Sequence, residues 1–247
     1  MQQLIMGRPF TDSNALNILI VFVEILAVMG FYASPAIIYR YSIKEAPLEP
    51  AKAKQFNLIF TAAYVLLIVL AIAVFKISAL TLLGILIWIP FNYLILTDDG
   101  NSPNPVVRLF NKYQELAVYL IVGVITTIVA WTVFFLLSFV LDSNDGFQLT
   151  LNTILNWTAG VLVAYPMNRS WVFKSRSDKK LKEFIEFVAS RITTLIIEEV
   201  VMLLCVDVIG INQYISKYVI ASILVIVLNY VFSKLFVFKK KDKTEEV

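Results

Sequence analysis

The stretch QELAVYLIVGVITTIVAWTVFFLLSFVL, residues 114–141, decides the class of fold. It holds a single charged side chain, that of Glu115. A helix needs about 20 mostly apolar residues to cross the hydrocarbon core of a bilayer, and this segment exceeds that length. The rest of the chain is similar, since 59% of its 247 residues are hydrophobic and 16% are charged. Soluble domains contain about 25% charged residues, so the sequence predicts an all-α integral membrane protein.

About seven transmembrane helices are predicted. Besides 114–141, apolar stretches long enough to cross a bilayer occupy residues 15–39, 56–75, 77–96, 149–173, 184–209 and 214–238. The second and third are divided at the turn around Lys76, because an undivided run would be about twice as long as one span needs. Glu24 and Pro35 leave a re-entrant or surface-lying first helix open as an alternative. A cleaved signal peptide is not expected, because residues 1–14 lack a basic region.

Lysine and arginine side chains gather in loops on one side of the predicted spans. Four follow the first span, two precede the fourth, five lie between the fifth and sixth, and four follow the seventh, against three on the opposite side. Because cytoplasmic loops carry the excess of cations, we expect a cytoplasmic C-terminus and, with seven spans, an outer N-terminus. The larger set is Arg40, Lys44, Lys52, Lys54, Arg108, Lys112, Lys174, Arg176, Lys179, Lys180, Lys182, Lys239, Lys240, Lys241 and Lys243, and the smaller is Arg8, Lys76 and Lys217.

Residues 97–105, TDDGNSPNP, are the clearest linker, because turn-forming residues are concentrated there. We therefore expect two parts. Residues 1–104 form an N-terminal membrane region of about three helices. Residues 105–247 form a four-helix membrane domain with a basic cytoplasmic tail.

The C-terminal part repeats itself. Ile125-Thr126-Thr127 recurs as Ile192-Thr193-Thr194, an offset of 67 residues. The string cation-x-aromatic-Val-Phe-Lys that ends at Lys174 recurs with its end at Lys239, an offset of 65 residues. Both copies run in the same direction through the bilayer, so they predict a parallel repeat of two hairpins about an axis along the membrane normal. The seam between the hairpins is where we expect a binding site.

These motifs resemble the GtrA-like family of small four-helix membrane proteins over residues 114–240. The resemblance rests on the Tyr119–Gly123 opening, the block from Asn168 to Phe173, the restart at Phe184, and the Phe-Val-Phe ending after Asn229. Members of that family are implicated in moving polyprenyl-phosphate-linked sugars across the bacterial cytoplasmic membrane, for glycosylation of O-antigen or teichoic acid. The resemblance implies the same location and cargo here, and it leaves the three N-terminal helices unexplained.

Three polar side chains on the sixth predicted span share one helical face. Arg191, Thr194 and Glu198 fall within a narrow arc at about 100° per residue, and Glu199 is turned away from it. A charge inside a span costs about 2.5–3.5 kcal/mol on insertion scales, so each needs an explanation. We expect a hydrated path in which Arg191 meets a phosphate and Glu198 meets sugar hydroxyls. An interhelical pair that holds Arg191 is the alternative.

Arg169 and Lys234 occupy equivalent positions of the repeat, so we expect them at the same cytoplasmic depth. Together they suit a lipid phosphate, with arginine as a bidentate fork and lysine as a point charge. Ordinary snorkelling to the interface, beside an aromatic belt, is the alternative. The basic loop of residues 174–182 is expected to fix the topology and to attract anionic lipid head groups. Docking of a partner protein there is a further option.

Amide side chains complete the predicted substrate-binding set. Asn152 and Asn156 share a face of the fifth span, and Ser222, Asn229 and Ser233 form a similar stripe on the seventh. Such groups either hold helices together, with measured couplings of about 0.6 kcal/mol, or bind sugar hydroxyls. Both interpretations stay open at the level of sequence.

Other chemistry has little to build on. The chain has no histidine, the commonest general base and metal ligand, and its one cysteine, Cys205, lies in an apolar run without a partner for an intrachain disulfide. The sequence contains neither a phosphate-cradling Gly-rich loop nor a metal-ligand cluster. We therefore expect no enzymatic activity, no cofactor, no metal site and no nucleic-acid partner.

The leading hypothesis is a translocase, or part of one, for a polyprenyl-phosphate-linked sugar in the bacterial cytoplasmic membrane. One alternative is a membrane anchor that recruits a glycosyltransferase. Another is a proton-coupled exporter of small cations that uses Glu198 or Glu199 as the exchanging carboxylate. The expected partners are the sugar lipid, membrane lipids and a glycosyltransferase. Because four helices enclose little space, a homodimer is a further option.

Overall fold

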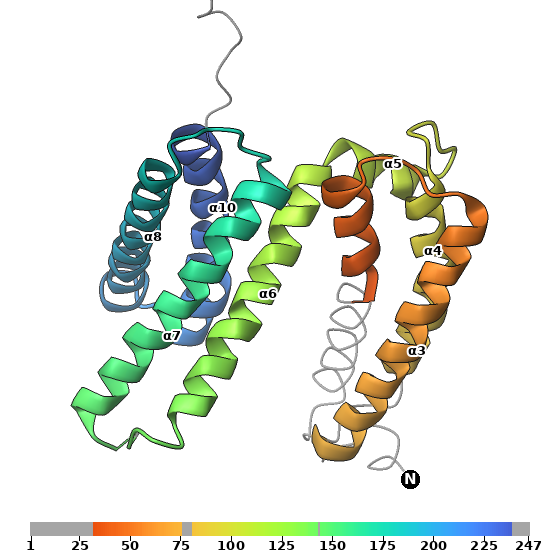
Figure 1. Cartoon of the computed structure of the whole chain (residues 1–247). Coiled ribbons are helices and arrows are strands. Elements are labelled where there is room, and N and C mark those ends of the chain that lie inside the picture. Colours follow the sequence, from red (N-terminus) through yellow and green to blue (C-terminus); the bar gives the residue numbers. More distant parts are fainter. Residues whose placement is uncertain (1–31, 76–80, 143, 239–247) are drawn as a thin grey trace, which may run out of the picture. The chain divides into compact units, whose positions relative to one another are not determined.

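The computed structural model describes residues 32–75, 81–142 and 144–238, and every regular element in these ranges is a helix (Figure 1). The all-α class is therefore confirmed. Each helix of more than ten residues overlaps one of the predicted apolar stretches. Glu24, the turn at Lys76 and the basic tail from Lys239 onward lie outside the described residues.

The chain divides into two compact units, Met1–Ile121 and Val122–Val247. The boundary falls inside α6 (Gln114–Leu137), whereas the sequence placed one in the linker at residues 97–105. That linker leads into a short helix, α5 (Pro105–Lys112), which stays with the first unit. The side chain of Asn104 caps α5, because its Oδ1 accepts the backbone N–H of Val106 at 2.9 Å. A cap of this kind stabilises a helix by about 1 kcal/mol.

In the first unit, α3 (Pro50–Phe75) packs along α4 (Thr81–Thr97) (Figure 1). Residues 32–38 are helical and continue into a π-helical turn, η1 (Tyr39–Ile43). The backbone N–H of Leu48 donates to the carbonyl of Leu96 at 2.7 Å, which fastens the loop before α3 to the end of α4. The buried core between these elements includes a cluster of Ala36, Ala53 and Leu96.

A polar network joins the end of η1 to α5. The hydroxyl of Tyr41 donates to Oδ1 of Asn111 at 2.6 Å, and Nδ2 of Asn111 donates to Oδ2 of Asp98 at 2.6 Å. The guanidinium of Arg40 donates to the backbone carbonyl of Asp98 at 2.8 Å. Tyr41 is 4% exposed, and its burial raises the pKa of the hydroxyl to about 12. The network holds the linker between η1 and α5.

In the second unit, α6 is followed by α7 (Gly146–Met167), which runs into the π-helical turn η2 (Asn168–Val172). A further hairpin then packs α8 against α10 (Figure 1). Its elements are α8 (Lys180–Leu203), η3 (Leu204–Val208), α9 (Gln213–Ile215), η4 (Ser216–Ala221), α10 (Ser222–Phe232) and η5 (Ser233–Val237). η2 and η5 close with the same bond, since Phe173 N–H donates to the carbonyl of Asn168 at 2.9 Å and Phe238 N–H to that of Ser233 at 2.8 Å.

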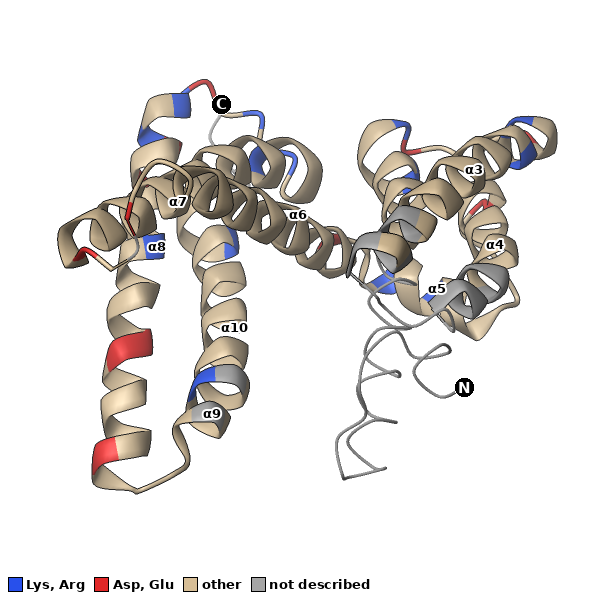
Figure 2. Ribbon diagram, turned by 90° about the horizontal axis from the view of Figure 1, so that it is seen from below, with Lys and Arg blue, Asp and Glu red and all other residues tan. Residues whose placement is uncertain are grey.

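Two helices among the described residues are long and apolar enough to cross a bilayer, Gln114–Leu137 and Val219–Val237. Only 6% and 11% of the residues in their apolar windows are buried in the protein. A core helix of a soluble protein would be mostly buried, so this exposure indicates a lipid environment. The other five predicted spans stay predictions. Figure 2 shows acidic and basic residues along the length of α8, whereas α6 is almost free of them.

Candidate functional site

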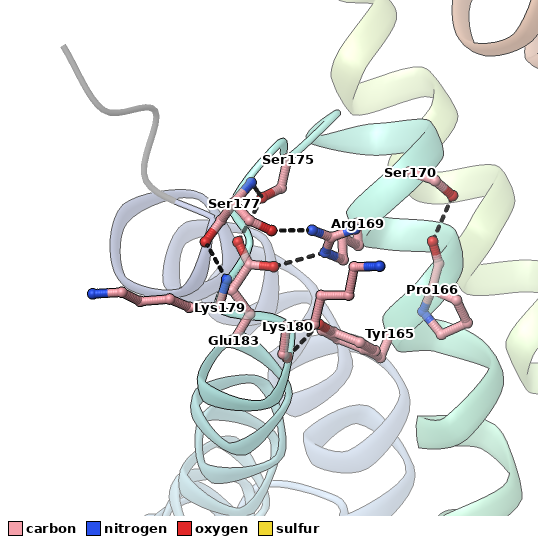
Figure 3. A network of polar contacts seen from close by, with 9 residues as sticks. All are labelled: Tyr165, Pro166, Arg169, Ser170, Ser175, Ser177, Lys179, Lys180 and Glu183. Carbon is pink, nitrogen blue, oxygen red and sulfur yellow. Dashed lines mark hydrogen bonds and ion pairs between the residues drawn. The ribbon is translucent and has the colours of Figure 1, made fainter. Parts of the chain in front are cut away.

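A connected polar cluster surrounds Arg169 on η2 (Figure 3). Its Nε donates to Oε2 of Glu183 at 2.8 Å, and its Nη2 donates to the carbonyl of Ser177. The hydroxyl of Ser175 donates to the other carboxylate oxygen of Glu183. The Arg169 and Glu183 side chains are 19% and 8% exposed, so the ion pair is largely buried. Hydrogen bonds to both partners help to offset the loss of hydration that burial imposes.

The cluster also fixes the path of the basic loop at residues 174–182. The hydroxyl of Tyr165 donates to the carbonyl of Lys180 at 2.7 Å, and the backbone N–H of Ser175 donates to the carbonyl of Arg169 at 2.9 Å. The loop is therefore held through its backbone, while its cations stay on the surface. The exposed cations are Lys174, Arg176, Lys179, Lys180 and Lys182.

Arg169 and Lys234 occupy matching positions, because each is the second residue of its π-helical turn. Their partners differ. The ammonium of Lys234 donates to the hydroxyl of Tyr230 at 3.1 Å and lies 5.3 Å from the centroid of that ring. The sequence analysis gave Arg169 a phosphate or an interfacial position and did not foresee its carboxylate partner, Glu183.

Arg191 lies on an aromatic cluster inside the second unit. Its guanidinium carbon is 4.5 Å from the centroid of the Phe187 ring, within the range of about 6 Å in which a cation is attracted to a ring face. Phe187 is fully buried, and its centroid is 5.7 Å from that of Tyr165 and 6.1 Å from that of Phe238. The predicted phosphate-binding arginine thus lies on Phe187, which itself contacts rings from both hairpins.

Those rings form what we call the aromatic seam, which consists of Tyr165 and Phe173 from the end of the first hairpin and Tyr230 and Phe238 from the end of the second. Phe173 and Phe238 stack with centroids 5.0 Å apart and planes inclined by 17°. Tyr165 meets Phe238 at 6.2 Å, and Phe173 meets Tyr230 at 6.0 Å. The tyrosine of each hairpin therefore contacts the phenylalanine of the other.

Thr194 and Asn229 come together although they are 35 residues apart in the chain. The hydroxyl of Thr194 donates to Oδ1 of Asn229 at 2.9 Å, and Thr194 is 1% exposed. The bond links α8 to α10 one helical turn beyond Arg191. Two predicted site residues therefore lie in contact, in the interface between these helices.

Glu198 pairs with a cation that the sequence analysis used only to assign orientation. Its Oε1 lies 2.7 Å from Nζ of Lys217 on η4, and the two side chains are 15% and 45% exposed. The pair links α8 to the returning helix. A signal was available, because Lys217 is the sole lysine or arginine that the sequence places on the outer side of the C-terminal domain.

Asn152 holds α7 against α6. Its Nδ2 donates to the carbonyl of Phe134 and to the hydroxyl of Ser138, both at 3.2 Å, and the residue is 1% exposed. Nδ2 of Asn156 donates to the carbonyl of Asn152 at 2.9 Å, within the same helix. For Asn152 these contacts favour a role in helix packing over contact with a sugar.

The apolar helices of the second unit are largely exposed, and polar side chains such as Thr194 and Glu198 bond to partners on neighbouring helices. These features define the second unit as a helical membrane domain. Residues 118–238 match the family model described as GtrA/DPMS, transmembrane domain. The chain belongs to this family, so the resemblance predicted from the sequence is confirmed. The match leaves residues 1–117 outside it.

Curated relatives agree with the family assignment. The cell wall teichoic acid glycosylation protein GtcA of Listeria monocytogenes is 35% identical over 134 residues, which are 53% of this chain and 89% of the relative. GtcA of Listeria innocua is 37% identical over 132 residues, 52% of this chain and 88% of the relative. The uncharacterized membrane protein YwcD of Bacillus subtilis is 33% identical over 125 residues, 49% and 94% of the two chains. No solved structure matches the chain.

Proposed function

We propose that this protein acts in cell wall glycosylation by moving a polyprenyl-phosphate-linked sugar across the bacterial cytoplasmic membrane, without catalysing a reaction itself. Membership of the GtrA/DPMS family and the teichoic acid glycosylation named for the GtcA relatives support the process. The observation that carries the transport step is the position of Arg191 on the aromatic cluster. A charge kept within an apolar helix is costly and marks a path for a polar substrate.

The proposed path follows α8. Arg191 receives the lipid phosphate, since its planar fork matches phosphate geometry. Thr194 and Asn229 supply hydrogen-bonding groups one turn further along. Glu198, together with Lys217, meets the sugar hydroxyls toward the outer end of the path.

At the inner face, we divide the roles of the two matching cations. Two nitrogens of Arg169 are committed to Glu183 and Ser177, so we assign Arg169 to shaping the basic loop. Lys234, beside the hydroxyl of Tyr230, is the proposed first contact of the phosphate.

We also propose that the second unit is a parallel repeat of two hairpins in a chain of seven spans with a cytoplasmic C-terminus. The matching turns η2 and η5 and the reciprocal contacts of the aromatic seam support the repeat. Equivalent groups exchange contacts in this way around a twofold axis. The excess of cations on one side of the predicted spans supports the orientation.

A membrane anchor for a glycosyltransferase is the second candidate. Five exposed cations on a loop with a fixed backbone path would suit an acidic surface on such an enzyme. The proton-coupled cation exporter has less support, because Lys217 already occupies the carboxylate of Glu198 and would compete with a transported cation.

Transport in vesicles that contain a labelled polyprenyl-phosphate-linked sugar tests the proposal. Arg191→Ala should stop the sugar lipid from appearing in the opposite leaflet, and Arg191→Lys should restore transport only in part. Glu198→Gln should have a milder effect, because an amide still bonds to hydroxyls. Arg108→Ala, an exposed cation of α5 outside the family match, is the control. Full transport by a well-folded Arg191→Ala protein would refute the proposed path.

A further inference from the structure

The two π-helical turns begin with buried polar residues at matching positions. Asn168 is the first residue of η2 and is 2% exposed, and Ser233 is the first residue of η5 and is 0% exposed. Oδ1 of Asn168 and Oγ of Ser233 have no hydrogen-bond partner among the residues that the structure describes. A buried polar atom without a partner is unfavourable, so two of them at matching positions call for an explanation. π-helical turns are themselves frequent at functional sites.

Both residues lie on the faces that meet in the aromatic seam. Tyr165 precedes Asn168 by three residues, a spacing at which side chains share a face of an α-helix. Phe173 follows Asn168 by five residues, the spacing that shares a face in a π-helical turn. Tyr230 and Phe238 flank Ser233 with the same spacings. The four rings contact one another across the seam. Asn168 and Ser233 are buried on the helix faces that carry these rings.

Oδ1 of Asn168 and Oγ of Ser233 favour a ligand that can both donate and accept a hydrogen bond. Nδ2 of Asn168 donates to the carbonyl of Ala164 at 2.8 Å, which orients the amide and leaves Oδ1 as an acceptor. The hydroxyl of Ser233 can both donate and accept. A neutral hydroxyl group satisfies this pair, because it can donate to Asn168 and accept from Ser233. A phosphate does not, because it offers the Asn168 oxygen no proton.

We propose that Asn168 and Ser233 form a hydroxyl-binding subsite for the carbohydrate head group, which enters as the two hairpins separate at the aromatic seam. This inference rests on the proposed transport of a lipid-linked sugar and adds a site that recognises the sugar itself. The surrounding rings supply the apolar surface that lines most ligand sites, and the two polar atoms fix the orientation.

Binding measurements on the full chain in nanodiscs test the subsite, with two probes: polyprenyl phosphate that carries a sugar and polyprenyl phosphate that carries none. Asn168→Ala and Ser233→Ala should each weaken binding of the glycosylated lipid by about two- to tenfold and leave binding of the bare lipid phosphate unchanged. Ser170→Ala is the matched control, because the exposed Ser170 hydroxyl on the same turn donates to the carbonyl of Pro166 at 2.6 Å, away from the Arg169 network (Figure 3).

The outcomes separate the subsite from the function on which it rests. Equal losses for both lipids, or no loss for either, would refute the subsite while transport stands. A change in thermal stability alone would also refute it, since an ordered water is then the only occupant. Failure of the wild-type protein to bind either lipid would remove the proposed function and the subsite together. If Asn168→Ala does not fold, Ser233→Ala decides, because it removes a single oxygen atom.

Discussion

Glu198 of α8 and Lys217 of η4 form an ion pair of 2.7 Å between the two helices of one hairpin. The carboxylate is 15% exposed and the lysine side chain 45%. Exposed ion pairs contribute little to the free energy of unfolding, whereas removing one partner of a buried pair is strongly destabilising. The Glu198–Lys217 pair is intermediate, because it is only partly buried. Its position on the predicted path makes it a structural link as well as a proposed contact for the sugar.

Lys217→Ala should lower the free energy of unfolding by about 1–2 kcal/mol, because the partly buried Glu198 loses its partner and the exposed lysine limits the effect. The exchange Glu198→Lys with Lys217→Glu should recover much of that loss. Unfolding in mixed micelles measures both. Lys52→Ala, which removes an exposed pair with Glu49 at 3.2 Å, should change stability by less than about 1 kcal/mol. Equal losses of stability in the Lys52 and Lys217 variants would show that partial burial does not strengthen the Glu198–Lys217 ion pair.

Glu183→Ala should destabilise the second unit by about 3–5 kcal/mol, because it leaves Arg169 buried without its carboxylate. The basic loop at residues 174–182 should then be cleaved faster by trypsin, because the hydrogen bonds of Arg169 and Ser175 to the Glu183 carboxylate are lost. Glu186→Ala is the control, because Glu186 pairs with Lys182 at 3.6 Å on the surface. Cleavage at the same rate in the two variants would contradict the assigned role of Glu183.

Tyr41 should make stability depend on alkaline pH. It lies beyond the first predicted span, and burial raises the pKa of its hydroxyl from 10.0 to about 12. Folding therefore favours the protonated form, and the resulting stabilisation is complete below pH 10 and is lost as the pH rises through about 12. The stability advantage of the wild type over Tyr41→Phe should shrink across that interval, as measured by unfolding at each pH. A constant difference would show that Tyr41 titrates like a free tyrosine.

The orientation of the chain can be tested at the turn between α6 and α7. A cysteine in place of the exposed Asn144 should react with an impermeant reagent added outside intact cells, because the cation distribution places this turn outside. A reporter fused after Val247 should be active in the cytoplasm. The comparison uses Cys205→Ser as background, so that the native thiol does not react. Labelling of residue 144 only after lysis would reverse the orientation.

The long helices could be predicted from the sequence because apolar stretches of about 20 residues are typical of helices that cross a bilayer. The stretch at 149–173, for example, ends one residue beyond η2, which ends at Val172. The domain boundary at residues 97–105 stays a prediction, because composition marks a linker but not which helices pack together. The run TDDGNSPNP has the composition of a linker, yet Asn111 and Asp98 tie the following helix back to the first unit. Such a bond depends on tertiary contacts that composition does not record.

The candidate site was predicted only in part, for a similar reason. Helical spacing placed Arg191, Thr194 and Glu198 on one face, but spacing within a helix says nothing of partners on another. Asn229 for Thr194 and Lys217 for Glu198 come from the returning helix. No signal in the sequence pointed to Glu183, and only the folded loop brings Arg169 to it.

The reciprocal ring contacts of Tyr165 with Phe238 and of Phe173 with Tyr230 bear on how such a protein could arise. Two separate copies of one helical hairpin, meeting around a twofold axis, would make the same pair of contacts. A gene encoding a single hairpin would then have been enough to build an ancestral dimer with this interface. Under the proposed repeat, fusion of two such genes would free each half to diverge, so that one turn begins with Asn168 and Arg169 and the other with Ser233 and Lys234.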